Sequence, residues 1–144
     1  MISSDSAVIF SYVLYLIGIR DYGIDKTETR QAIAEFFFMA AMTGRYTSSP
    51  ETRFESDLSM LRDLESGSSY LEKLREICTT TLTGDYWTIT LPSQLATSAS
   101  LSPSLFAYRA ALIKLDASVL YGPLKVKEQV DPAVRGSNTS GGIL

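Results

Sequence analysis

Apolar residues dominate the first helix-length segment of the chain. Residues 7–19 are apolar except for Ser11 and Gly18, and the serines and aspartate at 3–5 are suitable N-caps. Thirteen helical residues rise only about 20 Å, which is short of the roughly 30 Å hydrocarbon core of a membrane. We therefore predict a buried core helix over residues 6–20 and no membrane span.

Capping residues and glycines delimit three further helices. Asp25 and Glu28 form a variant of the capping box, and Ser49 precedes a proline that suits a first helical turn. Apolar residues then recur at helical spacing, most clearly between Phe54 and Leu61. The predicted helices run from Asp25 to Gly44, from Ser49 to Gly67 and from Ser69 to about Gly84.

The second half of the chain contains one more long helix. The stretch from Trp87 to Pro92 alternates in polarity, but no second strand of similar quality exists, so we predict an extended connector there. The helix that begins at Ser102 and Pro103 is apolar on more than one face, which predicts a central position. A short helix is predicted over residues 125–130.

These elements predict an all-α fold, a single compact bundle of about five helices. Residues 1–132 form the predicted domain, and residues 133–144, which include many Gly, Ser and Asn residues, form a flexible tail. The first, second and fifth helices are too apolar for ordinary surface helices. We expect them to form the centre of the bundle or to be covered in part by a partner. The residues predicted as core, from their positions on apolar helix faces, are Phe10, Leu14, Ile33, Phe37, Leu58, Leu74, Leu105, Leu112 and Leu115.

The amino-acid composition excludes several classes of enzyme site. The 144 residues include no histidine, so the chain lacks the usual general base near neutral pH and the commonest metal ligand. The single cysteine, Cys78, lies on an apolar stripe typical of a buried, unreactive thiol. Three carboxylates within two turns, Glu51, Glu55 and Asp57, are interpreted as a solvated helix face. We expect no metal, no cofactor and a cytoplasmic location.

One loop offers a candidate site for an anion or DNA. Arg45, Tyr46 and Arg53 flank a run of hydroxyl residues at a predicted helix start, where backbone N–H groups favour negative charge. The alternative is a helix cap in which Arg45 binds carbonyl groups at the end of the preceding helix. Because the net charge is -3 and the basic residues form no cluster, we expect DNA binding to be weak at most.

Three stretches of the chain form an ordered pattern. They are Gly44 to Leu58 (GRYTSSPETRFESDL), Trp87 to Ala99 (WTITLPSQLATSA) and Ser102 to Tyr121 (SPSLFAYRAALIKLDASVLY), followed by Val130, Asp131 and Pro132. This pattern resembles the helical region of GmrSD-type proteins, which are modification-dependent type IV restriction endonucleases and their relatives. Members of that family carry a ParB-like nucleotide-hydrolysing domain before this region and a His-Asn-His nuclease domain after it.

The resemblance implies a helical connector between two catalytic domains of a restriction, or phage-defence, protein. Neither the Asp-Gly-Gln-Gln-Arg signature of the first domain nor the His-Asn-His motif of the second occurs here, so we expect no enzymatic activity of this chain alone. The alternatives are a DNA-contacting module of the same system and an independent helical protein-interaction domain. The resemblance leaves the role of its motif positions open: Arg45, Tyr46, Pro50, Arg53, Pro92, Ser102, Pro103 and Tyr108.

The apolar perimeter of the first helix predicts partners. Nine apolar residues between positions 8 and 17 sample every direction around the helix axis, so some must point away from the core. We expect this surface to contact a second copy of the chain, or the adjacent catalytic domains of a full-length parent protein.

Overall fold

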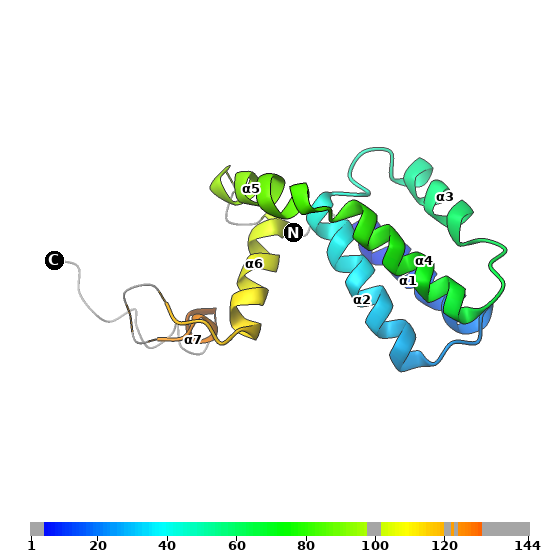
Figure 1. Cartoon of the computed structure of the whole chain (residues 1–144), viewed down its shortest axis with the longest axis horizontal. Coiled ribbons are helices and arrows are strands. Elements are labelled where there is room, and N and C mark those ends of the chain that lie inside the picture. The colour runs from blue at the N-terminus through cyan, green and yellow to red at the C-terminus, as the bar shows by residue number, and fades with distance from the viewer. Residues whose placement is uncertain (1–4, 98–101, 120–121, 123, 131–144) are drawn as a thin grey trace. The chain divides into compact units, whose positions relative to one another are not determined.

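The structure, a computed structural model, describes residues 5–97, 102–119, 122 and 124–130 (Figure 1). Every regular element within these ranges is helical, apart from one isolated antiparallel bridge between Ser118 and Lys125. The predicted all-α fold is confirmed. Over the same ranges, no helix is both long enough and apolar enough to cross a membrane.

The chain divides into two compact units, Met1–Ser104 and Leu105–Leu144. This division falls inside the range that the sequence predicts as one domain, residues 1–132. The predicted tail, residues 133–144, lies outside the described residues. The first unit contains the helical bundle described next.

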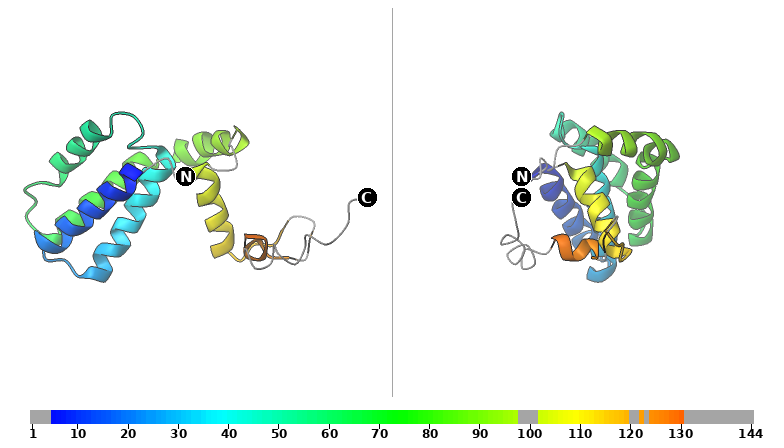
Figure 2. Two further views of the ribbon diagram at one scale, coloured as in Figure 1. Left: turned by 180° about the vertical axis from the view of Figure 1, so that it is seen from behind. Right: turned by 90° about the vertical axis from the view of Figure 1, so that its left-hand side faces the viewer.

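Four helices form the bundle of the first unit (Figure 1 and Figure 2). They are α1 (Asp5–Arg20), α2 (Lys26–Thr43), α3 (Pro50–Leu61) and α4 (Gly67–Thr81). α1 and α2 form a helical hairpin, α4 packs against α2, and α3 lies against α4 through fewer contacts. A π-helical turn, η1 (Tyr86–Thr90), then leads directly into the short helix α5 (Leu91–Thr97).

Both ends of α2 follow from capping residues in the sequence. The backbone N–H groups of Glu28 and Thr27 donate to the Asp25 carboxylate at 3.2 and 2.8 Å, and these bonds lower the pKa of Asp25. At the other end, Gly44 adopts a left-handed φ of 61° and stops the helix. The predicted helix from Asp25 to Gly44 is confirmed.

Gly44→Ala is expected to lower the free energy of unfolding by about 1–2 kcal/mol, because a Cβ atom is unfavourable in left-handed backbone. The added Cβ would also lie 3.2 Å from the Thr47 Oγ1 atom. Gly84→Ala is the matched control, since Gly84 has no positive φ and open space around it. Urea denaturation of both variants checks the prediction, and equal midpoints would contradict it.

The boundary between α3 and α4 differs from the prediction. α3 ends at Leu61, because Arg62 is extended and Asp63 takes a left-handed φ of 58°. Gly67 does not end a helix but begins α4, whose N-cap is Ser66 rather than the predicted Ser69. A Cβ atom on Gly67 would lie 2.7 Å from a side-chain carbon of Ile24, so close packing explains this glycine better than helix termination does.

The predicted extended connector from Trp87 to Pro92 is also wrong, because this stretch is helical. With no partner strand in the described ranges, its backbone groups bond locally, and the Leu91 N–H donates to the Tyr86 carbonyl in the π pattern. The Thr88 hydroxyl donates to the Gly84 carbonyl at 2.9 Å. Pro92 is the second residue of α5 and directly follows the π-helical turn, where the backbone already departs from the regular α-helical hydrogen-bond pattern that proline cannot join.

The core of the first unit comes mainly from α1, α2 and α4. Its cluster of buried apolar residues consists of Ala7, Leu14, Ala32, Ile33, Phe36, Met39, Ala40, Tyr46, Leu61, Tyr70, Leu71, Leu74 and Ile77. Six residues predicted as core belong to this cluster or pack against it: Phe10, Leu14, Ile33, Phe37, Leu58 and Leu74. Of the three helices predicted at the centre, the first two contribute to this core, and α4 supplies the rest of it in place of the fifth predicted helix.

α6 (Pro103–Lys114) begins at the predicted proline, but it is not the central helix that the sequence predicts. Its Phe106 and Tyr108 side chains are exposed, and Leu115, predicted as a core residue, is 77% exposed. An apolar helix is enclosed only when several neighbours surround it. Beyond α6, the described part of the second unit contains just one helix, the five-residue α7 (Val126–Val130).

Candidate functional site

Two of the three candidate anion-binding residues belong to a buried polar network. Arg45, in the turn after α2, makes a two-pronged contact with the Asp57 carboxylate of α3, with Nε–Oδ2 and Nη2–Oδ1 distances of 2.8 and 2.6 Å. The Tyr46 hydroxyl donates to Asp57 Oδ2 at 2.6 Å. Arg45 also donates to the Thr81 hydroxyl of α4 at 3.3 Å. The network therefore joins the turn after α2 to α3 and α4.

Burial and charge act together in this network. The side chain of Arg45 is 4% exposed and that of Asp57 is 0% exposed. Burial opposes the charge of Arg45, but the hydrogen bonds and charge of Asp57 outweigh it and raise the pKa of the guanidinium. Burial, with the hydrogen bond to Asp57, raises the pKa of Tyr46. Arg45 stays charged and Tyr46 stays protonated over the whole physiological range.

Aromatic rings close one side of the network. Phe10 of α1 stacks on Phe54 of α3 with ring centroids 4.0 Å apart, and it meets the Tyr46 ring edge-on at 5.0 Å. The donors of Arg45 and Tyr46 thus point at Asp57 inside the bundle. The structure does not bring them to an anion-binding surface with Arg53, which is exposed on α3. The alternative helix cap is met by the backbone of Arg45 and not by its side chain. The Arg45 N–H donates to the Ala40 carbonyl near the end of α2 at 3.0 Å, whereas the guanidinium binds a carboxylate and a hydroxyl.

Asp57 is the residue that sequence reasoning missed. Interpreted as part of a solvated face, it is instead fully buried. The signal lies in its spacing, because Asp57 is three residues after Phe54 and four before Leu61 and so shares their apolar side of the helix. A carboxylate on an apolar stripe needs a buried partner, and Arg45 supplies it.

The remaining motif positions lie at helix starts or on the surface. Pro50 is the first residue of α3, Pro92 is the second residue of α5, and Ser102 and Pro103 lie at the start of α6. Tyr108 is exposed on α6. Pro50 and Pro103 therefore have a structural explanation, because first-turn positions do not need the N–H that proline lacks.

Cys78 lies on α4 and is partly buried next to the core. Burial, reinforced by the negative charge of Glu35, raises the pKa of its thiol to about 11. A thiol with that pKa is almost fully protonated at neutral pH and is a poor nucleophile. The sequence-based interpretation of Cys78 as an unreactive thiol is consistent with this environment.

Iodoacetamide is expected to alkylate Cys78 about a hundredfold more slowly in the folded protein than in urea at pH 8. The reason is that raising the thiol pKa from 9.0 to about 11 reduces the reactive thiolate by that factor. Mass spectrometry of timed samples measures the rate. Equal rates in the folded and unfolded protein would contradict the prediction.

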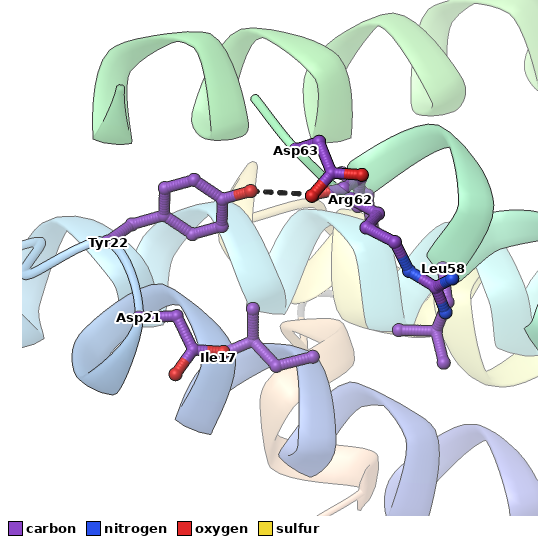
Figure 3. A pocket seen from close by; sticks show the side chains of 7 residues that line it. Ile17, Asp21, Tyr22, Leu58, Arg62 and Asp63 are labelled. Atoms are coloured by element: carbon purple, nitrogen blue, oxygen red, sulfur yellow. Dashed lines mark hydrogen bonds between the residues drawn. The ribbon is translucent and has the colours of Figure 1, made fainter. Parts of the chain in front are cut away.

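A pocket of about 440 Å³ opens where α1 and α3 end (Figure 3). Its lining residues are Ile17, Asp21, Tyr22, Leu58, Leu61, Arg62 and Asp63. The Tyr22 hydroxyl donates to the Leu61 carbonyl at 2.9 Å, which caps the end of α3. Asp21 and Asp63 are exposed, whereas catalytic carboxylates are usually buried or paired to work near neutral pH. What the pocket residues visibly contribute to the fold is the Tyr22 bond to the end of α3.

Elsewhere in the described residues, acidic side chains and Cys78 form no group that could hold a metal ion.

The surface of α1 is the remaining candidate for a functional site. Four small or medium residues of this helix are buried against the bundle: Ala7, Ser11, Leu14 and Gly18. An α-helix turns by about 100° per residue, so these positions occupy one side of α1.

The opposite side of α1 is apolar between two charged ends, and we call it the α1 outer face. It consists of Asp5, Val8, Ile9, Tyr12, Leu16, Ile19 and Arg20, which lie within about 120° of one another around the helix axis. Val8, Ile9 and Tyr12 are 50%, 57% and 60% exposed. No charged residue occurs between Asp5 and Arg20. An exposed apolar row of this kind is typical of a contact surface.

A close approach to α2 and α4 explains the glycine on the inner side of α1. A Cβ atom on Gly18 would lie 2.9 Å from the Thr29 side chain of α2 and 3.3 Å from the Tyr70 ring of α4. The Tyr70 hydroxyl donates to the Leu14 carbonyl at 2.8 Å. α1 therefore approaches α2 and α4 most closely at Gly18, and Leu14 is buried in the same row of the helix.

Comparison with protein-family models, with curated proteins and with solved structures finds no match for this chain.

Proposed function

We propose that this chain is a non-catalytic helical connector that binds other protein surfaces through the α1 outer face. One observation carries the proposal: the exposed row of Val8, Ile9 and Tyr12 on a helix with no charge between its ends. Burying apolar surface contributes about 25 cal/mol per Å², which favours covering such a row with another protein. A cytoplasmic location is part of the proposal.

A DNA-contacting role has less support. Its candidate contact residues are Arg45, Tyr46 and Arg53, but the first two donate their hydrogen bonds to the buried Asp57 carboxylate. Arg53 alone on a protein of net charge -3 would give little phosphate attraction. A protein surface is therefore the better-supported kind of partner.

The finer proposal is that this connector belongs to a GmrSD-like restriction protein. Its support is the resemblance of three stretches in this chain to the helical region of that family. Gly44 to Leu58, the first of them, contains the buried network, so a shared structural role of Arg45 and Tyr46 is compatible with the resemblance. Purified chain is then expected to show neither nucleotide hydrolysis nor DNA nicking. Either activity, abolished by one substitution, would contradict a connector role.

Site-specific photo-crosslinking in living cells tests the proposed contact surface. A photoreactive amino acid in place of Tyr12 is expected to form protein–protein crosslinks, because this position is the most exposed of the apolar row. The same amino acid in place of Arg53, exposed on α3, is the matched control. Crosslinks from position 12 and few from position 53 support the proposal. Equal crosslinking, or none from position 12, contradicts it.

A further inference from the structure

We infer that the partner of the α1 outer face is a second copy of this chain, bound with the two α1 helices antiparallel. This inference rests on the proposed function and adds the identity and orientation of the partner. Two features carry it. They are the apolar row itself and the opposite charges at the two ends of the same helix side.

The positions of the charges favour a twofold-symmetric arrangement. Asp5 and Arg20 begin and end α1, about 22 Å apart along the axis, and both lie on the outer face. When two copies of this helix pack antiparallel, Asp5 of one copy lies opposite Arg20 of the other, and this pairing occurs twice. A parallel arrangement would instead place like charges together at both ends, which is unfavourable. The surface is therefore complementary to itself in the antiparallel orientation alone.

The apolar residues fit the same symmetry. The midpoint of α1 lies between Tyr12 and Val13, so the Tyr12 side chains of two antiparallel copies meet near the twofold axis. Ile9 of one copy is then level with Leu16 of the other. Aromatic and aliphatic side chains at the centre with charges at the rim are the usual composition of a protein interface. In the left view of Figure 2, α1 (blue) lies at the front surface of the bundle, and α4 (green) lies behind it.

Self-association through one helix face is expected to be weak. Stable dimers usually bury about 800 Å² per partner, and a single helix side provides less. Sedimentation or light scattering over a concentration series is therefore expected to show a reversible monomer–dimer equilibrium. Ile9→Ser is expected to weaken dimerisation at least tenfold, because two symmetric copies of the residue leave the interface. Ile89→Ser is the matched control, since Ile89 is 65% exposed on η1 and should leave dimerisation unchanged.

Charge reversal at the helix ends tests the orientation. Asp5→Arg gives α1 two positive ends, Arg20→Asp gives it two negative ends, and each variant alone should dimerise about tenfold more weakly than the unmodified chain. An equal mixture of the two variants should regain association as a mixed dimer. Circular dichroism of each variant checks that α1 stays helical. Regained association in the mixture also shows that the weakness of each single variant does not arise from misfolding.

Several results would overturn the inference. They are a monomer at every concentration, a dimer that Ile9→Ser leaves unchanged, single charge variants that dimerise as well as the unmodified chain, or a mixture that associates no better than either variant. These failures are separable from a failure of the proposed function. Crosslinks from position 12 to a different protein, with none to a second copy, would support the proposed contact surface and contradict the inference that its partner is a second copy of this chain.

Discussion

Asp57→Ala is expected to lower the free energy of unfolding by about 3–5 kcal/mol, because the substitution leaves the buried Arg45 charge without a partner. The Tyr46 hydroxyl loses its acceptor at the same time. Loss of these bonds also removes the link that Asp57 makes between α3 and the turn that follows α2. Chemical denaturation monitored by circular dichroism measures the change, and a loss of this size can unfold a small bundle at room temperature.

Glu55→Ala is the matched control for this prediction. Glu55 is an exposed carboxylate on the same helix, so its removal should change stability by no more than about 0.5 kcal/mol. A double substitution, Arg45→Met with Asp57→Leu, should recover much of the stability that Asp57→Ala loses, because it removes both buried charges. If Asp57→Ala and Glu55→Ala destabilise equally, the network does not hold the turn and α3 together.

Phe36→Ala is expected to destabilise the bundle by a similar amount, about 3–5 kcal/mol. Phe36 lies on α2 and is fully buried, so truncation both removes apolar burial and leaves a cavity. Two residues further along the same helix, Phe38 is 49% exposed. Phe38→Ala should therefore cost less than about 1 kcal/mol.

Denaturation midpoints of the two phenylalanine variants provide the comparison. Because the same side chain is removed from the same helix, differences in helix propensity cancel, and only burial remains. A larger effect for Phe38→Ala than for Phe36→Ala would mean that α2 is rotated about its axis relative to the arrangement described above.

Local signals in the sequence account for much of the first unit. Asp25 and Gly44 fix α2 because capping depends on neighbouring backbone groups and on a left-handed residue, both of which are local properties. Gly67 is a position that local signals do not explain. A glycine is required there by close approach of Ile24, more than forty residues away in the chain, and nothing near Gly67 reveals that contact.

The candidate site could be predicted only in part. The excess of apolar residues on α1 was evident, but which of them face outward depends on where α2 and α4 pack. Arg45, Tyr46 and Arg53 predicted an anion site because two arginines and several hydroxyl groups surround a predicted helix start. Their acceptor is a carboxylate of the chain itself, and charge pairing at a separation of 12 residues leaves no pattern in the sequence beyond an acid on an apolar stripe.

The close approach at Gly18 has a consequence for how α1 tolerates change over evolution. The inward position 18 admits only glycine without a rearrangement, since even one added carbon there would collide with Thr29. Outward positions carry no such restriction from the fold and would accept serine, lysine or glutamate in a chain that functions alone. Among related sequences, small residues held at 7, 11 and 18 would record selection on folding. Apolar residues conserved at 8, 9 and 12 would indicate selection for binding a partner. Conservation at the inward and at the outward positions of α1 would thus report separately on folding and on binding.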